Sequence, residues 1–164
     1  MELKTLEHGE IDAALALADE YKSRSQSEIA ESICQDILGI EPDHIGALDL
    51  LYWTRIDALK KGLPGAVERV QELLLRFAKD SDRAYRTGVF REEQARHLLG
   101  QRGQHSNFIA YDWFRHAMDE FEEAVMTEPR LLEARLHWNA CVRTLRANPQ
   151  CKPTPDEMEE HGIE

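Results

Sequence analysis

Two groups of residues have the types and spacing that metal chemistry uses. His137 and Cys141 lie four residues apart, so they share one face of a helix. His97, His105 and His116 surround an expected turn and could converge in the fold. A structural zinc site needs four such ligands, and two at one spacing are not a site. We therefore interpret His137 as a packing residue and Cys141 as a small buried thiol, and we expect no metal and no cofactor.

The sequence contains none of the short motifs that commonly position catalytic groups. A glycine-rich phosphate loop, a Gly-x-Ser-x-Gly elbow and a His-Glu-x-x-His pair are all missing. The carboxylates are too numerous for any two to be selected as an acid–base pair. Cys34, Cys141 and Cys151 have no paired spacing, which favours reduced thiols in a cytoplasm over a disulfide framework. These features predict a cytoplasmic protein that is not an enzyme.

Charge is unevenly distributed along the 164 residues, whose net charge is −11. Residues 51–110 carry more bases than acids, whereas the segments on either side are strongly acidic. An acidic chain is a poor nucleic-acid binder, because phosphate contacts need a large positive surface. No apolar run approaches the roughly 18 residues that span a bilayer. We therefore expect neither nucleic-acid binding nor membrane insertion.

The basic segment has two interpretations. It is either a solvated helix face or a patch that receives an acidic segment of a partner. Arg83 and Arg86 are its candidates for partner binding. The bases concerned are Arg69, Arg76, Lys79, Arg83, Arg86, Arg91, Arg96 and Arg102.

Apolar residues recur at helical spacing in seven segments. The expected helices cover residues 9–22, 25–39, 43–61, 64–77, 81–99, 106–128 and 130–147. Ser25 and Glu28 are spaced as a capping box at the start of the second helix, and Ser106 is the expected cap of the sixth. The inward-facing residues include Ile29 in the second helix and Leu132, Leu136 and Asn139 in the seventh. We expect one domain over residues 1–147 and a proline-containing acidic tail over 148–164, with one short helix from Thr154.

One residue pattern occurs twice with the same spacing. Tyr21, Ala30, Cys34 and Pro42 have the offsets that Phe108, Ala117, Phe121 and Pro129 repeat, and Ala66 and Ala124 are further small residues of the pattern. The small residue allows two helices to approach closely, and the proline ends the second helix. The chain therefore resembles tetratricopeptide-repeat (TPR) proteins over residues 11–147, as a small stand-alone protein of bacterial type.

The resemblance implies an all-α fold, a right-handed α-solenoid of about three helical hairpins plus a C-terminal capping helix. It also implies a concave groove that holds a peptide or helix of a partner protein, so the chain is expected to be an adaptor or to act like a chaperone. Carried over position by position, the groove residues are Asp12, Leu15, Asp19, Lys22, Asp49, Trp53 and Ile56. Two alternatives are a helical protein that binds a metal or small molecule, and a scaffold that assembles with copies of itself.

Overall fold

The computed structural model of the chain describes residues 2–101 and 103–154, and every regular element in these ranges is a helix. This confirms the predicted all-α class. The chain divides into two compact units, Met1–Phe77 and Ala78–Glu164. The single repeat domain over residues 1–147 stays a prediction, and most of the helix expected from Thr154 lies outside the described residues.

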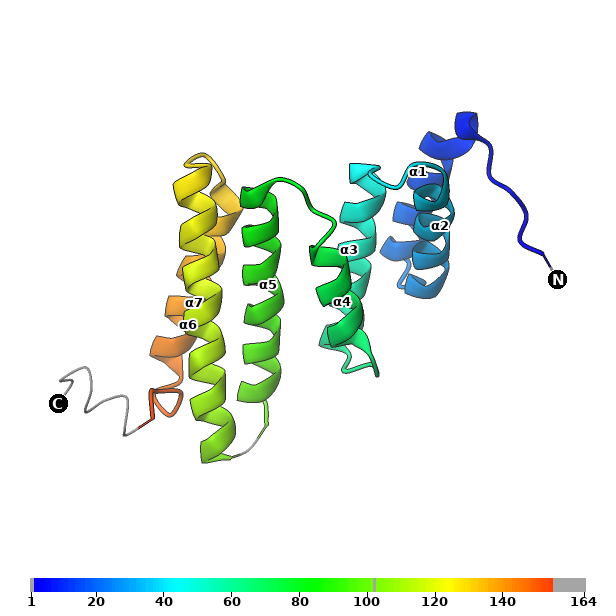
Figure 1. Cartoon of the computed structure of the whole chain (residues 1–164). Helices are drawn as coiled ribbons and strands as arrows, with labels where there is room; N and C mark the ends of the chain where they lie inside the picture. The colour runs from blue at the N-terminus through cyan, green and yellow to red at the C-terminus, as the bar shows by residue number, and fades with distance from the viewer. Residues whose placement is uncertain (1, 102, 155–164) are drawn as a thin grey trace. The chain divides into compact units, whose positions relative to one another are not determined.

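The first unit is built from two successive pairs of helices (Figure 1). Its elements are the short 3-10 helix η1 (His8–Glu10), α1 (Ile11–Ser23), α2 (Ser27–Ile40), α3 (Ile45–Lys60) and α4 (Ala66–Leu74). Each of α1, α2 and α3 packs against the next helix along the chain, and α1 also contacts α3. The first pair is α1 with α2 and the second is α3 with α4, and the two pairs meet mainly through α2 and α3.

Large side chains of α3 form the centre of the first unit. Tyr52 is fully buried, and its ring meets the edge of Phe77 at a centroid distance of 6.1 Å. Arg55 is mostly buried and joins three helices: its Nε donates to Glu31 on α2 at 3.1 Å, and its Nη1 donates to the backbone oxygen of Arg69 on α4 at 2.7 Å. The guanidinium thereby connects α2, α3 and α4.

The predicted capping box at Ser25 and Glu28 is wrong. Ser25 has a φ of 62°, and its N–H donates to Lys22 O at 2.9 Å, while the next N–H, of Gln26, donates to Tyr21 O at 2.9 Å. These two bonds form a Schellman motif, which ends α1. Ser25 therefore closes the first helix and does not begin the second.

Helix α3 ends in the same Schellman motif, and here glycine, the residue that the motif favours, occupies the left-handed position. Gly62 has a φ of 66°, its N–H donates to Leu59 O at 2.9 Å, and Leu63 N–H donates to Ala58 O at 3.1 Å. Glycine adopts this left-handed conformation without a steric penalty. Gly62 therefore closes this helix, in agreement with the expected end of the third helix at residue 61.

The second unit contains a long helical hairpin and one further helix (Figure 1). Helix α5 (Asp80–Leu99) has 20 residues and α6 (Gln104–Thr127) has 24, so these are the two longest of the described helices. Gly88 allows their close approach, since a Cβ atom there would lie 2.5 Å from the ring of Phe121. Helix α7 (Leu132–Ala147) packs mainly on α6 and also contacts α5.

Three helices end in the same kind of turn. Glu41, Glu128 and Asn148 follow α2, α6 and α7, leave the helical conformation with ψ angles of 88°, 88° and 73°, and precede a proline. Each backbone oxygen accepts the N–H of the residue three positions on, at 3.1, 3.0 and 2.9 Å. Proline disfavours the α conformation for the residue before it, which explains why Pro42 and Pro129 follow the helix ends where the pattern predicts.

The two copies of the sequence pattern agree only in part. Their small residues Ala30 and Ala117 are both fully buried, and Ala66, Phe121 and Ala124 are buried as well. The aromatic positions differ, however. Tyr21 lies in α1, one helix before Ala30, whereas Phe108 lies in α6, on the same helix as Ala117. The helices that carry the small residue, α2 and α6, therefore correspond to each other in the pattern, whereas the helices before them, α1 and α5, do not.

Four residues that we expected to face inward are exposed, namely Ile29, Leu132, Leu136 and Asn139. In α7 only one face meets α5 and α6, where Ala134 and Cys141 are buried. Pro64 precedes Gly65 and lies outside α4, and α6 starts two residues before Ser106. None of the described helices combines the length and the apolar composition that crossing a lipid bilayer requires.

Candidate functional site

An apolar hollow of about 380 Å³ lies between α6 and α7. Its α6 side is built from residues of the last two turns, and its α7 side from residues of the first two. The lining residues are Phe121, Glu122, Val125, Met126, Arg135, Trp138 and Asn139. Phe121 is fully buried in the α5–α6 packing, so it belongs to the rigid part of the unit and not to the rim.

Exposed apolar side chains extend the hollow outward. Met126 on α6 is 82% exposed, and Leu132 and Leu136 on α7 are 51% and 54% exposed. Leu136 is one helical turn after Leu132, and each lies three residues before a lining residue, Arg135 or Asn139, on the same helix. Single exposed apolar residues are common, but a group beside an apolar hollow is typical of a contact surface.

Trp138 holds the two helices of the hollow in register. Its Nε1 donates a hydrogen bond to the Glu122 carboxylate at 3.1 Å, from α7 to α6. The indole is half-buried, so one face contacts the unit and another part remains accessible. A tryptophan of this kind, with its N–H satisfied, supplies apolar contact area at low conformational cost.

Below the hollow, aromatic rings connect it to α5. Phe121 stacks on the ring of His137 with centroids 5.4 Å apart, and both rings lie near Tyr85 of α5. This ring cluster includes one residue from each helix of the unit. The position of the hollow's inner wall therefore depends on how His137 is held.

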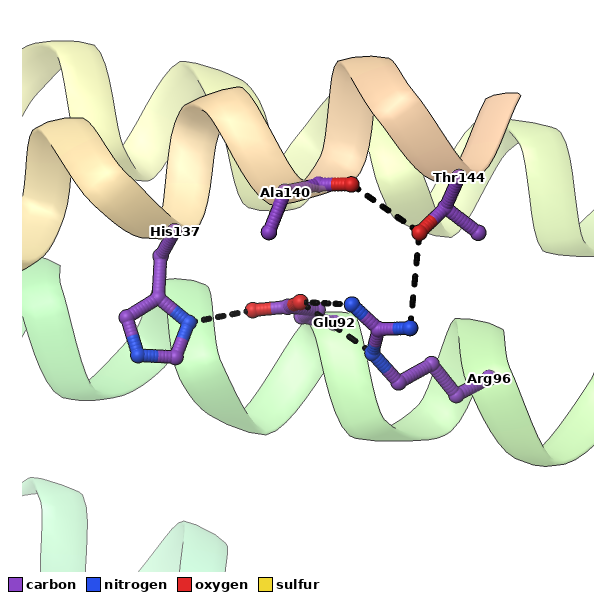
Figure 2. A network of polar contacts seen from close by, with 5 residues as sticks. All are labelled: Glu92, Arg96, His137, Ala140 and Thr144. Atoms are coloured by element: carbon purple, nitrogen blue, oxygen red, sulfur yellow. Dashed lines mark hydrogen bonds and ion pairs between the residues drawn. The ribbon is translucent and has the colours of Figure 1, made fainter. Parts of the chain in front are cut away.

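His137 is held by a buried carboxylate, as Figure 2 shows. Glu92 of α5 has a side chain that is 3% exposed, and its Oε2 lies 2.6 Å from Nδ1 of His137. Its Oε1 accepts hydrogen bonds from Nε and Nη2 of Arg96, at 3.1 and 2.5 Å. Arg96 in turn reaches Thr144 Oγ1 at 3.4 Å, so the network fastens α5 to α7.

Opposing effects act on the pKa of Glu92. Burial raises the pKa of this carboxyl, but hydrogen bonds from His137 and Arg96, together with their charges, outweigh the burial and lower it. The carboxylate is therefore ionised and accepts the proton of His137 Nδ1. Such a pair orients an imidazole, as in hydrolytic triads.

Acidic residues lie along the α6 edge of the hollow. Asp119, Glu122 and Glu123 are exposed, and Asp119 lies one turn before Glu122 on the same side of the helix. Neighbouring Glu120 is paired with Arg91 at 3.2 Å. The pKa of Glu120 is nevertheless raised, first by burial and then by the charges of Glu123 and Asp119. Asp119 and Glu123 are therefore close enough for their charges to act on Glu120, beside its pairing with Arg91.

The basic segment of the sequence does not form an open cationic patch. Arg83 pairs with Asp80, Arg86 is buried and lies 3.9 Å from Asp82, and both pairs stay within α5. Further pairs in the second unit join Lys79 to Glu128 at 2.5 Å, Arg91 to Glu120, and Arg96 to Glu92. These bases therefore form ion pairs within the second unit, and their role as acceptors of an acidic partner segment stays a prediction. Arg102 lies outside the described residues.

The groove residues taken from the resemblance have mixed positions in the first unit. Asp12 and Asp19 are exposed on α1, and Leu15 is half-buried beside Gly46. Lys22 forms an ion pair with Asp57 of α3 at 3.2 Å, so this pair joins α1 to α3. The structure brings these α1 residues to the side that α3 contacts.

On α3, the expected groove residues are more enclosed than the resemblance implies. Asp49 and Trp53 are half-buried, and the Trp53 ring meets Tyr52 edge-on at 5.1 Å. Ile56 is fully buried, which corrects its assignment as a groove residue, because a side chain without exposed surface cannot contact a partner. Among these residues, only Trp53 offers aromatic surface.

The candidate metal ligands do not come together. In the described part of the chain, no three His, Cys, Asp or Glu side chains are grouped so that they could hold a metal ion. His137 is bound to Glu92, and Cys141 is buried among the helices of the second unit. Burial raises the pKa of Cys141 to about 12, so its thiol is a poor ligand and a poor nucleophile.

From the sequence, Phe121 was selected by the repeat pattern and Asn139 was expected to face inward, but the hollow that they line was not predicted. Met126 and Arg135 were not singled out. The sequence did carry a signal for an exposed apolar surface, because α7 has apolar residues on two faces. Leu132 and Leu136 cannot be buried on the face that carries Ala134 and Cys141. In three comparisons, no protein-family model, no curated protein and no solved structure matches this chain.

Proposed function

We propose that this protein is a non-enzymatic interaction module and that the α6–α7 hollow receives an apolar side chain of a partner protein. The observation that carries the proposal is the combination of an apolar hollow with exposed Met126, Leu132 and Leu136 beside it. Contact residues of high energetic weight are commonly large apolar side chains that enter such pockets. A peptide or a helix of the partner fits the space between two helices.

The hollow is better supported as the binding site than the groove inferred from the resemblance. Of the α3 groove residues, Ile56 is buried and Trp53 is packed on Tyr52, whereas Met126 projects into solvent. A TPR-type solenoid remains part of the proposal, supported by the buried small residues and the matched proline turns of α2 and α6. A cytoplasmic location is also proposed, supported by the free thiols of the three cysteines.

The proposal is tested by photo-crosslinking in the native cells. A benzophenone amino acid at Asn139, which is exposed on the edge of the hollow, should crosslink a discrete partner protein. The same amino acid at Asp36, exposed on α2 of the first unit, is the matched control. Equal crosslinking at the two positions, or none at Asn139, contradicts a binding site at the hollow.

A substitution pair tests the contribution of the apolar rim. Met126 and Leu75 are both 82% exposed, so replacing either with Gln has little effect on the fold. Met126→Gln should weaken partner recovery about tenfold if the methionine is buried in the complex, and Leu75→Gln should leave it unchanged. An equal effect of the two substitutions argues for non-specific apolar adhesion.

A further inference from the structure

We infer that the partner segment bound at the α6–α7 hollow is a cationic amphipathic helix, with apolar side chains in the hollow and Lys or Arg side chains over α6. This inference rests on the proposed function and names the chemistry of the partner. Two independent features of the site support it: the apolar lining of the hollow, and the distribution of charge along its two edges.

The α6 edge is acidic over two turns. Asp119, Glu122 and Glu123 are all exposed, and no salt bridge among the described residues neutralises Asp119 or Glu123. Glu122 is held in place by the hydrogen bond from Trp138, so its charge is fixed beside the apolar lining. A helix lying over α6 therefore meets ordered negative charge at the points where its flanking residues project.

The α7 edge differs in charge and gives the site a polarity. Arg135 lines the hollow opposite Glu122, and it is exposed. A partner with cations on both flanks is repelled on this side, whereas a partner with one cationic flank meets complementary charge on α6 only. The expected ligand therefore has one apolar face and a basic flank on one side of it.

The length of the hollow determines the spacing of the apolar residues that a partner helix must present. The hollow is lined over two turns of α6, from Phe121 to Met126, and over a little more than one turn of α7, from Arg135 to Asn139. A partner helix covers such a span with two apolar residues at positions i and i+4, or i and i+3. Lys or Arg one position before each apolar residue then lies toward one edge.

The experiment uses two synthetic 16-residue helical peptides that have the same leucine face and differ only in the flank, which is lysine in one and glutamate in the other. Binding of each fluorescently labelled peptide to the full chain is measured by polarisation at low and at 0.5 M salt. We expect the lysine peptide to bind at least tenfold more tightly, and to weaken in high salt because the charges are screened. Stronger binding of the glutamate peptide, or no binding of either, overturns the inference.

Charge variants show whether this preference is local. Asp119→Lys and Glu123→Lys should each weaken the lysine peptide about three- to tenfold, and Arg135→Gln should strengthen it about twofold. Asp36→Lys changes the net charge of the chain by the same amount on α2 and should have less than a twofold effect. If Asp36→Lys weakens binding as much as Asp119→Lys, the attraction comes from the overall negative charge and the inference fails.

The proposed function and this inference fail separately. A partner that crosslinks at Asn139 but presents a neutral or acidic segment leaves the proposed function standing and overturns the cationic helix. Absence of any crosslinked partner at Asn139 contradicts the proposed function itself, whatever the peptides do.

Discussion

The carboxylate of Glu92 on α5 lies 2.6 Å from Nδ1 of His137 on α7, and the same carboxylate accepts two hydrogen bonds from Arg96. The pair joins two helices that share few other contacts, and the His137 ring stacks on Phe121 at the inner wall of the hollow. One buried carboxylate thus connects α5 to α7 and orients the ring that stacks on the inner wall of the candidate site.

Replacing this carboxylate should destabilise the protein. Glu92→Ala leaves the polar groups of Arg96 and His137 unpaired, and we expect a loss of about 2 kcal/mol in the free energy of unfolding. The loss is lower than for a fully buried pair, because both partners are partly exposed. Urea unfolding followed by circular dichroism measures it. Glu133→Ala, an exposed glutamate of α7, is the control and should change stability by less than about 0.5 kcal/mol.

The protein should also become less stable in acid, because Glu92 becomes protonated there. The pKa of Glu92 is lowered in the folded state from its ordinary value of 4.5, so the folded state favours the ionised form. Its contribution to stability is complete above that ordinary value and is lost as the pH falls through the lower folded pKa. Between about pH 5 and pH 3, the unfolding free energy of the wild type should decrease more steeply than that of Glu92→Gln. Parallel curves for the two proteins would show that Glu92 is not held ionised by its neighbours.

The close approach of α5 and α6 should be sensitive to one methyl group. In Gly88→Ala the new Cβ meets the Phe121 ring at 2.5 Å, so the ring or the helices must shift, at an expected cost of about 1–3 kcal/mol. This outweighs the gain of about 1 kcal/mol that alanine brings to a helix. Gly39→Ala on α2 is the matched control, because its Cβ meets nothing within 4 Å, and it should not destabilise the protein. Thermal unfolding of both variants gives the comparison.

The turn after α1 should become more stable with glycine. Ser25 has a φ of 62°, a conformation that costs a residue with a Cβ about 1 kcal/mol. Ser25→Gly removes this cost, and part of the gain is offset by the greater freedom of glycine in the unfolded chain. We expect a stabilisation of about 0.5 kcal/mol. The converse substitution Gly62→Ser, at the same position of the α3 ending, should destabilise, and opposite signs for the pair are the test.

The three thiols should be unreactive in the folded protein. Burial raises the pKa of Cys34 and Cys151 to about 11 and that of Cys141 to about 12, far above that of an exposed thiol. Iodoacetamide at neutral pH should therefore label none of them within minutes, and all of them after denaturation. Labelling is counted by intact mass. Rapid modification of the native chain at Cys151 would show that this residue is accessible in solution.

Local sequence patterns determined the helices and several of their ends. The apolar spacing placed seven helices within a few residues of their positions, and Gly62, Pro42 and Pro129 marked ends that depend on backbone geometry alone. Ser25 was misread because a serine beside a helix start has the composition of an N-cap, and its actual role depends on hydrogen bonds to the preceding helix. The burial of the alanines in the repeat pattern was predicted from their small side chains and their helical spacing.

Tertiary packing decided which face of each helix is covered and which charges are paired. Periodicity shows that α7 has two apolar faces, but only the positions of α5 and α6 determine that Ala134 is buried and Leu136 is exposed. The basic residues from Lys79 onward could be a solvated face or a patch in sequence, because acidic partners such as Glu120 on α6 and Glu128 just after it are far away along the chain. The pairing of Glu92 with His137, 45 residues apart, has the same cause. Short-range rules describe the backbone of each helix, whereas the candidate site arises from distances between helices.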